Sequence, residues 1–306
     1  MNPEAIIECV PNFSEGADVS KVSKIVAAMQ VEGVRLLDWS LDAAHNRSVV
    51  TIAGCPEAVV ESVVRAAGKA AELIDLTQQS GVHPRIGAAD VIPFIPVSGA
   101  SLADCALLAR NAGLLIWRRY GIPVYFYGAA AARPDRVQLE DVRKGQFEGL
   151  RAASHRDASR RPDIGGPELH ETAGASAVGA RNFLIAYNVH LGQPDITAAR
   201  AIARDIRGAN GGLHGVKALG VLVNGRAQVT MNITDHRTTP MQKVYDRLLD
   251  LANRHGASIE DAELIGLIPQ DAYEPDAAWI ARIPNFDPTL KVLERRLEQP
   301  LSWITS

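Results

Sequence analysis

The sequence contains few cysteines. Three occur among 306 residues, Cys9, Cys55 and Cys105, and an odd number cannot pair completely within one chain. They lie far apart among apolar neighbours, and no two of them form a CxxC pair. This pattern argues against a disulfide framework and is typical of reduced, buried thiols in a cytoplasmic protein.

Long hydrophobic runs are absent as well. No apolar run approaches the ~18 residues that a membrane-spanning helix requires. The first residues, MNPEAIIECV, carry acidic side chains where a signal peptide would carry positive charge. We therefore expect a soluble cytoplasmic protein that makes no membrane contact.

An excess of positive charge is also missing. The formal net charge is -3 at pH 7, whereas nucleic-acid-binding proteins usually carry a basic face or stripe. We expect no nucleic acid partner and infer that the chain acts on small molecules.

Several common catalytic motifs do not occur. The sequence has no P-loop and no GxSxG. The pair of His170 and Glu171 lacks the second histidine of a zinc protease helix, because position 174 is glycine. The glycine-rich segment 208–215 follows a predicted helix instead of a strand, so it does not match a dinucleotide-binding turn. We expect no metal site.

The sequence does contain a repeated order of predicted elements. In the first half, apolar runs and amphipathic periodicity predict the order β-α-β-β-α-β. The predicted strands are residues 5–10, 34–39, 48–54 and 91–97, and the predicted helices are residues 18–30 and 56–76. A further helix, 101–120, and a strand, 123–127, extend this unit.

The same order returns after residue 180. There the predicted strands are 183–191, 216–223, 227–235 and 263–268, and the predicted helices are 195–207 and 241–255. We therefore predict an α/β (α+β) fold of two ferredoxin-like βαββαβ subdomains, residues 1–180 and 181–306, with a ligand cleft between them.

Between the two repeats the periodic signal fades. Residues 133–150 have the pattern of a short helical piece, and residues 155–180 have that of a long loop. A loop of this length in a compact protein is either disordered or functional.

Polar residues gather in a stiff loop of the first unit. Residues 80–99, SGVHPRIGAADVIPFIPVSG, place His83, Arg85 and Asp90 directly before a predicted strand. Pro84 restricts His83 to extended backbone, so the segment cannot be helical. From these residues alone, His83 is either a catalytic side chain or a structural one.

A second polar group joins two predicted strands. Asp38, Asp42, His45, Asn46 and Arg47 lie at the end of one strand and the start of the next. In a ferredoxin-like unit, this connection and the His83 loop can face the same edge of the sheet. The alternative is that these residues only form a capped turn.

Six segments together resemble one enzyme family. They are residues 8–16 (ECVPNFSEG), 45–47 (HNR), 83–97 (HPRIGAADVIPFIPV), 123–128 (PVYFYG), 179–188 (GARNFLIAYN) and 264–269 (LIGLIP). The sequence is similar to the folate-dependent glutamate formiminotransferases over nearly its whole length, and the HPR segment is the most specific part of the likeness. That family transfers a formimino group from N-formimino-L-glutamate to tetrahydrofolate in histidine degradation.

The resemblance implies a two-subdomain α/β fold, a homodimer, and tetrahydrofolate as co-substrate. It also places the family's catalytic histidine on His83. The N5 nitrogen of the folate must lose a proton when it attacks the formimino carbon, and the departing glutamate nitrogen must gain one. Histidine can perform both transfers in turn, because this residue type titrates near neutrality.

By the same resemblance, the family's folate-contacting loop falls on ten consecutive residues. These are Ile164, Gly165, Gly166, Pro167, Glu168, Leu169, His170, Glu171, Thr172 and Ala173. The segment is more polar and more acidic than the loop typical of animal members, and His190 stands where an asparagine is usual. The chain ends at Ser306, so we expect the cyclodeaminase domain that is fused to the animal enzymes to be absent.

Both substrates of that family carry carboxylates, so arginines are expected to bind them. The candidates are Arg47, Arg85 and Arg181, which lie in matched segments, and Asn46 is a further candidate beside Arg47.

An acidic side chain is expected to orient His83 or to hold the cationic formimino group. Asp38, Asp42 and Asp90 can each supply it, and the sequence does not choose among them.

Two other functions remain open. Formyl transfer between 5-formyltetrahydrofolate and glutamate passes through a similar tetrahedral carbon, and the sequence does not discriminate formyl oxygen from formimino nitrogen. The alternative outside the enzymes is a folate-binding protein without turnover. Folate binding with no exchange that depends on His83 would favour that alternative.

Overall fold

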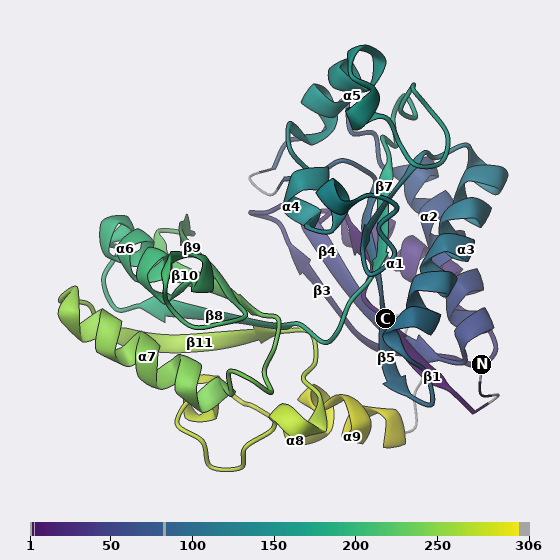
Figure 1. The fold of residues 1–306 in the computed structure, drawn as a ribbon. Coiled ribbons are helices and arrows are strands. Elements are labelled where there is room, and N and C mark those ends of the chain that lie inside the picture. The colour runs from purple at the N-terminus through teal and green to yellow at the C-terminus, as the bar shows by residue number, and fades with distance from the viewer. Residues whose placement is uncertain (1, 3, 82–83, 300–306) are drawn as a thin grey trace. The chain divides into compact units, whose positions relative to one another are not determined.

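The computed structural model describes residues 2, 4–81 and 84–299 (Figure 1). Within this part the chain divides into two compact units, one that ends at Arg181 and one that begins at Asn182. Each unit has its own hydrophobic core, which is built on its own sheet.

The first unit is built on a sheet of mixed direction. Its strands are β1 (Ile6–Cys9), β2 (Asn12–Phe13), β3 (Val34–Asp42), β4 (Arg47–Gly54), β5 (Ala89–Ser98), β6 (Val124–Gly128) and β7 (Ser176–Ala180). β1 and β2 lie one after the other between β4 and β5, β3 lies outside β4, and β7 lies between β5 and β6. β5, β6 and β7 run parallel, and the remaining pairs are antiparallel.

Long helices pack against one face of this sheet (Figure 1). They are α1 (Val19–Ala28), α2 (Pro56–Leu73) and α3 (Leu102–Tyr120). The Asp18 carboxylate caps α1 by accepting a hydrogen bond from the Lys21 amide at 3.1 Å. Pro56 opens α2, and Ser101 and Asp104 form a reciprocal capping box at the start of α3. The helix starts therefore follow from local sequence, as predicted.

The side chains of this sheet alternate between two surroundings. Toward the helices they are apolar, as at Ile52 and Phe94, which are both fully buried. The positions that alternate with them carry Arg47 on β4, Asp38 on β3 and Asn12 on β2. Because successive strand residues point to opposite faces, the first unit has one apolar and one polar sheet face.

The second unit has an antiparallel sheet in the order β11-β8-β10-β9. Its main elements are β8 (Ile185–Leu191), α6 (Ile196–Ile206), β9 (Val216–Val223), β10 (Arg226–Ile233), α7 (Met241–Arg254) and β11 (Ile259–Ile265). Tyr187 and Val189 are buried in the core with α6 and α7, whereas Asn188 and His190 lie on the opposite face. This sheet therefore also has a polar face.

Hydrogen bonds cross the strands on the polar face of the second unit. Asn188 Nδ2 and Gln228 Nε2 both donate to Glu263 Oε1, at 2.8 and 3.0 Å. His190 Nδ1 lies 2.5 Å from Asp261 Oδ1. These contacts join β8, β10 and β11 through their side chains as well as through their backbones.

Short helical segments complete the two units. They are η1 (Pro134–Arg136), α4 (Leu139–Val142), α5 (Gln146–Arg156), η2 (Ala158–Arg160), η3 (Gly208–Asn210), η4 (Gln270–Ala272), η5 (Ile280–Arg282), α8 (Pro288–Lys291) and α9 (Leu293–Glu298). Near the end of the described chain, the fully buried Trp279 packs edge-on against Tyr187, with ring centroids 5.8 Å apart. The last segments thus belong to the core of the second unit.

The predicted mixed α/β fold is confirmed, and each unit contains the predicted β-α-β-β-α-β order. The largest error concerns β7, because residues 155–180 are predicted as a loop. At Gly179, β7 has no room for a side chain, because a Cβ there would lie 2.5 Å from the Tyr127 ring. Small residues have weak strand propensity, so packing between two neighbouring strands decides this element.

The predicted start of the last strand is also wrong. β11 begins at Ile259, four residues before the predicted strand 263–268, and it ends at Ile265. Glu260 and Asp261 interrupt the apolar pattern there, where the pairing of β11 with β8 shifts register between Ile259 and Asp261. An apolar run alone therefore places the strand too late.

Replacement of Phe94 tests the core of the first unit. Phe94→Ala removes a fully buried ring from the centre of β5, and we expect it to lower the free energy of unfolding by about 3–5 kcal/mol. The exposed Leu107 on α3 is the matched control, and Leu107→Ala should cost less than about 0.5 kcal/mol. Urea denaturation with hydrogen-exchange mass spectrometry would assign the loss to the first unit. Equal effects of the two changes would contradict this packing.

Candidate active site

A fully buried carboxylate, Asp90, lies at the start of β5 where several loops meet. Its Oδ1 accepts a hydrogen bond from the Ile86 amide at 2.8 Å. Its Oδ2 accepts from Arg47 Nη1 at 3.0 Å and from Arg143 Nη2. Buried charges are tolerated when they are paired and hydrogen-bonded. Asp90 therefore joins the start of β4, the turn after α4 and the loop before β5.

Arg47 is held from a second side by Asn12. Its Nε and Nη2 donate to Asn12 Oδ1 at 3.0 and 2.7 Å, and Asn12 Nδ2 donates to the Val10 carbonyl at 2.7 Å. Burial, together with the nearby charge of Arg143, lowers the pKa of Arg47 to about 10, against the opposing effect of Asp90. Arg47 thus remains a cation at neutral pH, with its guanidinium fixed on the polar face of the sheet.

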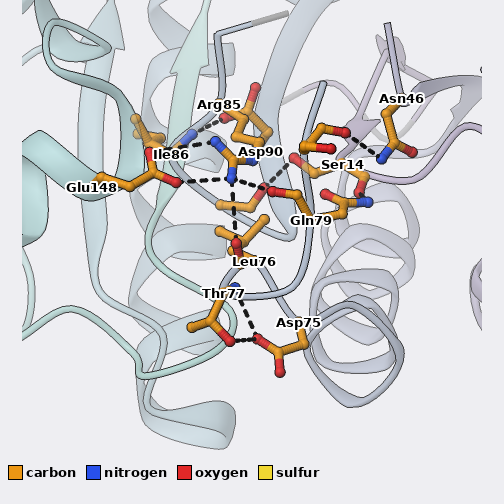
Figure 2. A network of polar contacts seen from close by, with 12 residues as sticks. Ser14, Asn46, Asp75, Leu76, Thr77, Gln79, Arg85, Ile86, Asp90 and Glu148 are labelled. Atoms are coloured by element: carbon orange, nitrogen blue, oxygen red, sulfur yellow. Dashed lines mark hydrogen bonds and ion pairs between the residues drawn. The ribbon is translucent and has the colours of Figure 1, made fainter. Parts of the chain in front are cut away.

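The predicted HNR turn lies against the loop before β5. Asn46 has a left-handed backbone conformation (φ 49°) between β3 and β4, which asparagine tolerates. Its Oδ1 accepts from the Gly16 amide at 3.0 Å. Its Nδ2 donates to the Ser80 carbonyl at 2.9 Å (Figure 2). The two polar segments predicted from the sequence therefore lie side by side.

Arg85 holds the HPR segment to its surroundings. Its Nη2 donates to the carbonyl oxygens of Gln79 and Leu76 at 2.8 and 3.3 Å, and it forms an ion pair of 2.9 Å with Glu148 on α5 (Figure 2). The residue is only 8% exposed. These contacts give Arg85 a structural role in the loop, while substrate contact by Arg85 stays a prediction.

The predicted catalytic residue, His83, lies outside the described residues. The segments on both sides of it are described. Ser80 is held by Asn46, and Ile86 is held by Asp90. The loop that carries His83 is therefore anchored to the polar network at both ends.

The predicted folate segment, 164–173, is fixed at both ends by backbone hydrogen bonds. Ile164 and Val124 exchange two of them, at 3.0 and 3.2 Å, beside the start of β6. The other end is joined to the 76–88 region by Leu76 N to Thr172 O, Ala88 N to Ala173 O and Ala175 N to Ile86 O, each 2.9 Å. The folate segment and the HPR segment are thus direct neighbours in one unit.

The folate segment presents a polar outer surface. Its exposed residues are Gly166, Glu168 and Glu171, its half-buried residues are Ile164, Gly165, Pro167, His170 and Thr172, and its buried residues are Leu169 and Ala173. His170 Nδ1 accepts a hydrogen bond from the Ala173 amide at 3.1 Å. Gly174 (φ 68°) closes the segment where a Cβ would lie 2.2 Å from the Ile86 carbonyl oxygen.

Arg181 and Tyr127 extend the polar network along the sheet. Arg181 directly follows β7, and its amide donates to the Phe94 carbonyl at 3.1 Å. Its side chain forms a hydrogen bond with the Tyr127 hydroxyl. Burial raises the pKa of Tyr127 to about 12, although the charges of Arg181 and Arg143 act in the opposite direction. Burial likewise raises the pKa of the Cys9 thiol, which stays neutral at pH 7.

The other two acidic candidates have different surroundings. Asp42 Oδ2 lies 2.5 Å from His45 Nδ1, and Asp42 Oδ1 accepts from the His45 amide at 2.9 Å. Burial raises the pKa of Asp42, but the hydrogen bonds with His45 outweigh it and leave the pKa below its ordinary value. Asp38 is half-buried on β3, opposite Thr51. Asp90, in contrast, belongs to the HPR segment itself and accepts a hydrogen bond from the Ile86 amide of the same segment.

Within residues 2, 4–81 and 84–299, no helix is long and apolar enough to cross a lipid bilayer. The same ranges contain no group of three or more histidine, cysteine, aspartate or glutamate side chains placed to hold a metal ion.

Comparison with known proteins assigns the chain to a family. The formiminotransferase domain, N-terminal subdomain, matches residues 6–181, and the formiminotransferase domain matches residues 186–285. The chain belongs to the formiminotransferase family. It is 39% identical over 295 residues to the glutamate formimidoyltransferase of Streptococcus pyogenes serotype M1, an alignment that covers 95% of this chain and 98% of that relative.

Two further relatives show how widely this formiminotransferase sequence is shared. The glutamate formimidoyltransferase of Thermoplasma acidophilum is 39% identical over 300 residues, which cover 96% of this chain and 98% of the relative. The formimidoyltransferase-cyclodeaminase of Gallus gallus is 39% identical over 276 residues, which cover 87% of this chain and 51% of the relative.

Asn12, Tyr127 and Arg143 belong to the polar network but are not among the site residues predicted from the sequence. Asn12 and Tyr127 lie in segments that resemble the formiminotransferases, so that likeness was the signal that could have found them. Arg143 lies where periodicity fades, and its partner Asp90 is 53 residues away in the sequence. No local pattern marks such a pair.

Asp90→Asn tests the central carboxylate of this polar network. The change leaves Arg47 and Arg143 without their buried counter-charge, so the free energy of unfolding should fall by about 3–5 kcal/mol. Asp42→Asn is the matched control, because 48% of the Asp42 side chain is exposed, and it should cost no more than about 1 kcal/mol. Urea denaturation measures both. A loss below 1 kcal/mol for Asp90→Asn would show that the carboxylate does not hold the network.

The raised pKa of the Tyr127 phenol predicts a loss of stability at alkaline pH. Its pKa of about 12 in the folded state lies above the ordinary value of about 10, so its contribution is complete below pH 10 and is lost as the pH rises toward 12. The two-unit difference corresponds to about 2–3 kcal/mol. Tyr127→Phe should therefore lose less stability than the wild type between pH 10 and 12, measured by denaturation at each pH. Parallel pH curves would contradict the burial of this phenol.

Proposed function

We propose that the chain transfers the formimino group from N-formimino-L-glutamate to tetrahydrofolate, a step of histidine degradation that gives 5-formiminotetrahydrofolate and L-glutamate. The observation that carries the proposal is the 39% identity to two glutamate formimidoyltransferases, each aligned over 98% of its length. The hydrogen bonds between the HPR segment and the predicted folate segment support it, because they bring two required parts together.

The reaction needs one proton to leave and one to arrive. The N5 nitrogen of tetrahydrofolate attacks the formimino carbon, a new C–N bond forms, and N5 loses its proton. The bond between that carbon and the glutamate nitrogen then breaks, and the glutamate nitrogen gains a proton. In this proposal His83 accepts the first proton and donates the second, so its initial protonation state returns after each turnover.

The two substrates would be held by different parts of the network. We assign tetrahydrofolate to residues 164–173, whose backbone is already fixed at both ends. A fixed binding segment loses little conformational entropy when the ligand binds. Arg47 and Arg181 are assigned to the carboxylates, since guanidinium groups bind carboxylates through paired hydrogen bonds.

The remaining candidates would position the loop that carries His83. Asn46 holds Ser80, and Arg85 holds Gln79, through the contacts described above. Asp90 anchors Ile86 on the other side. Asp38 and Asp42 are proposed to face the cationic formimino group.

The proposed location, oligomeric state, subdomain bounds and co-substrate rest on the family resemblance. We propose a cytoplasmic homodimer in which residues 1–180 and 181–306 form two subdomains. Tetrahydrofolate is the co-substrate, and the proposed reaction uses no metal.

His83→Ala tests the proposed function. Purified protein is mixed with tetrahydrofolate and formiminoglutamate, and the release of glutamate is measured. The wild type should turn over, and His83→Ala should be slower by about 10²- to 10⁴-fold, which is the typical contribution of a positioned acid–base residue. Folate binding, measured by calorimetry, should persist in the variant.

His214→Ala is the control, because 75% of the His214 side chain is exposed in the second unit, and it should leave turnover unchanged. If the wild type shows no turnover with formiminoglutamate but is active with 5-formyltetrahydrofolate and glutamate, the function is formyl transfer and not formimino transfer. Folate binding with neither reaction would identify a binding protein.

A further inference from the structure

Arg143 has a fixed backbone at the end of α4. Its amide donates to the Leu139 carbonyl at 3.0 Å, and its carbonyl accepts from the Gln146 amide at 2.8 Å. Only 13% of its side chain is exposed. The guanidinium therefore reaches Asp90 from a rigid turn and loses little additional freedom when it binds a ligand.

Not every donor of the Arg143 guanidinium has a hydrogen-bond partner among the described residues. Its Nη2 donates to Asp90 Oδ2, the same oxygen that accepts from Arg47. Its Nε is buried and, in the described portion of the chain, has no hydrogen-bond partner. Leaving a buried donor unpaired is unfavourable, so this geometry favours one further acceptor.

The electrostatic surroundings of Arg143 specify the charge of that acceptor. Arg143 acts on Arg47 as a like charge, and Arg143 and Arg181 both act on the Tyr127 phenol. Asp90 supplies one carboxylate to two guanidinium groups, those of Arg47 and Arg143. The like charges therefore still repel one another, and a further bound anion relieves that repulsion. A carboxylate suits such a group because its two oxygens match the guanidinium fork.

We propose that Arg143 binds a carboxylate of the donor substrate, as the third arginine of a subsite that also contains Arg47 and Arg181. Arg143 has this role only if the proposed function holds, since formiminoglutamate is then the dicarboxylate that reaches it. The competing role is structural, in which Arg143 merely fastens the turn after α4 to Asp90.

Arg143→Met tests this role, with Arg65→Met as the matched control. Arg65 carries the same charge on α2, is 49% exposed and pairs with Glu61. For Arg143→Met, the KM for formiminoglutamate should rise about 10- to 100-fold, the effect of losing one charged hydrogen bond. The kcat and the KM for tetrahydrofolate should stay close to the wild-type values. A fall in kcat at unchanged KM, or an equal effect in Arg65→Met, would overturn the proposal.

A series of donors separates binding from a structural effect. N-formimino-L-glutamine lacks the γ-carboxylate, and N-formimino-4-aminobutyrate lacks the α-carboxylate. The KM penalty of Arg143→Met should disappear with the donor that lacks the contacted carboxylate and persist with the other. A penalty of equal size with all three donors would assign Arg143 to structure alone.

Direct binding of L-glutamate distinguishes failure of this inference from failure of the proposed function. Calorimetry should show weaker binding to Arg143→Met than to the wild type. If the wild type transfers no formimino group but this difference is present, the subsite stands and the activity does not. If transfer proceeds and both proteins bind glutamate equally, the subsite is refuted.

Arg143→Lys replaces Arg143→Met if circular dichroism shows that the methionine variant does not fold. A wild-type KM for formiminoglutamate in Arg143→Lys would refute the paired hydrogen bond.

Discussion

The arrangement of the first unit depends on one buried carboxylate. Asp90 cannot be left without partners in a site that excludes water, and it receives an amide and two guanidinium groups. Those donors come from the loop before β5, the start of β4 and the end of α4. Because the buried charge of Asp90 must be compensated, these segments meet around its carboxylate although they share no sequence periodicity. A single electrostatic requirement thus brings three separate segments of the chain together.

Backbone hydrogen bonding explains why the irregular segments are nevertheless ordered. A buried loop must satisfy its amides and carbonyls, and it does so with strands, side chains or another loop. The segment 164–173 is satisfied at one end by the start of β6 and at the other by the 76–88 region. The HPR segment and the folate segment therefore stabilise each other. Both segments lie in the part of the chain that matches the N-terminal subdomain of the formiminotransferase domain.

In both units, the side chains of each strand alternate between an apolar and a polar face of the sheet. This alternation places the polar residues of the candidate site. The apolar residues form the cores with the helices, whereas residues such as Arg47 and Glu263 are left on the opposite faces. On the polar face of the first unit, the arginines meet Asn12 and Tyr127 instead of solvent alone. The chemistry of the site is thus a consequence of the twofold alternation of strand side chains.

Local sequence determined a large part of this protein. Capping residues, proline positions and periodicity are short-range signals, so they located the main helices and most strands, and the matched segments indicated the family. Tertiary structure decided what lies far apart in the sequence. β7 exists because small residues fit between β5 and β6, and Arg143 meets Asp90 across 53 residues. Packing and charge compensation act on distances in space, and such distances are fixed only after the chain has folded.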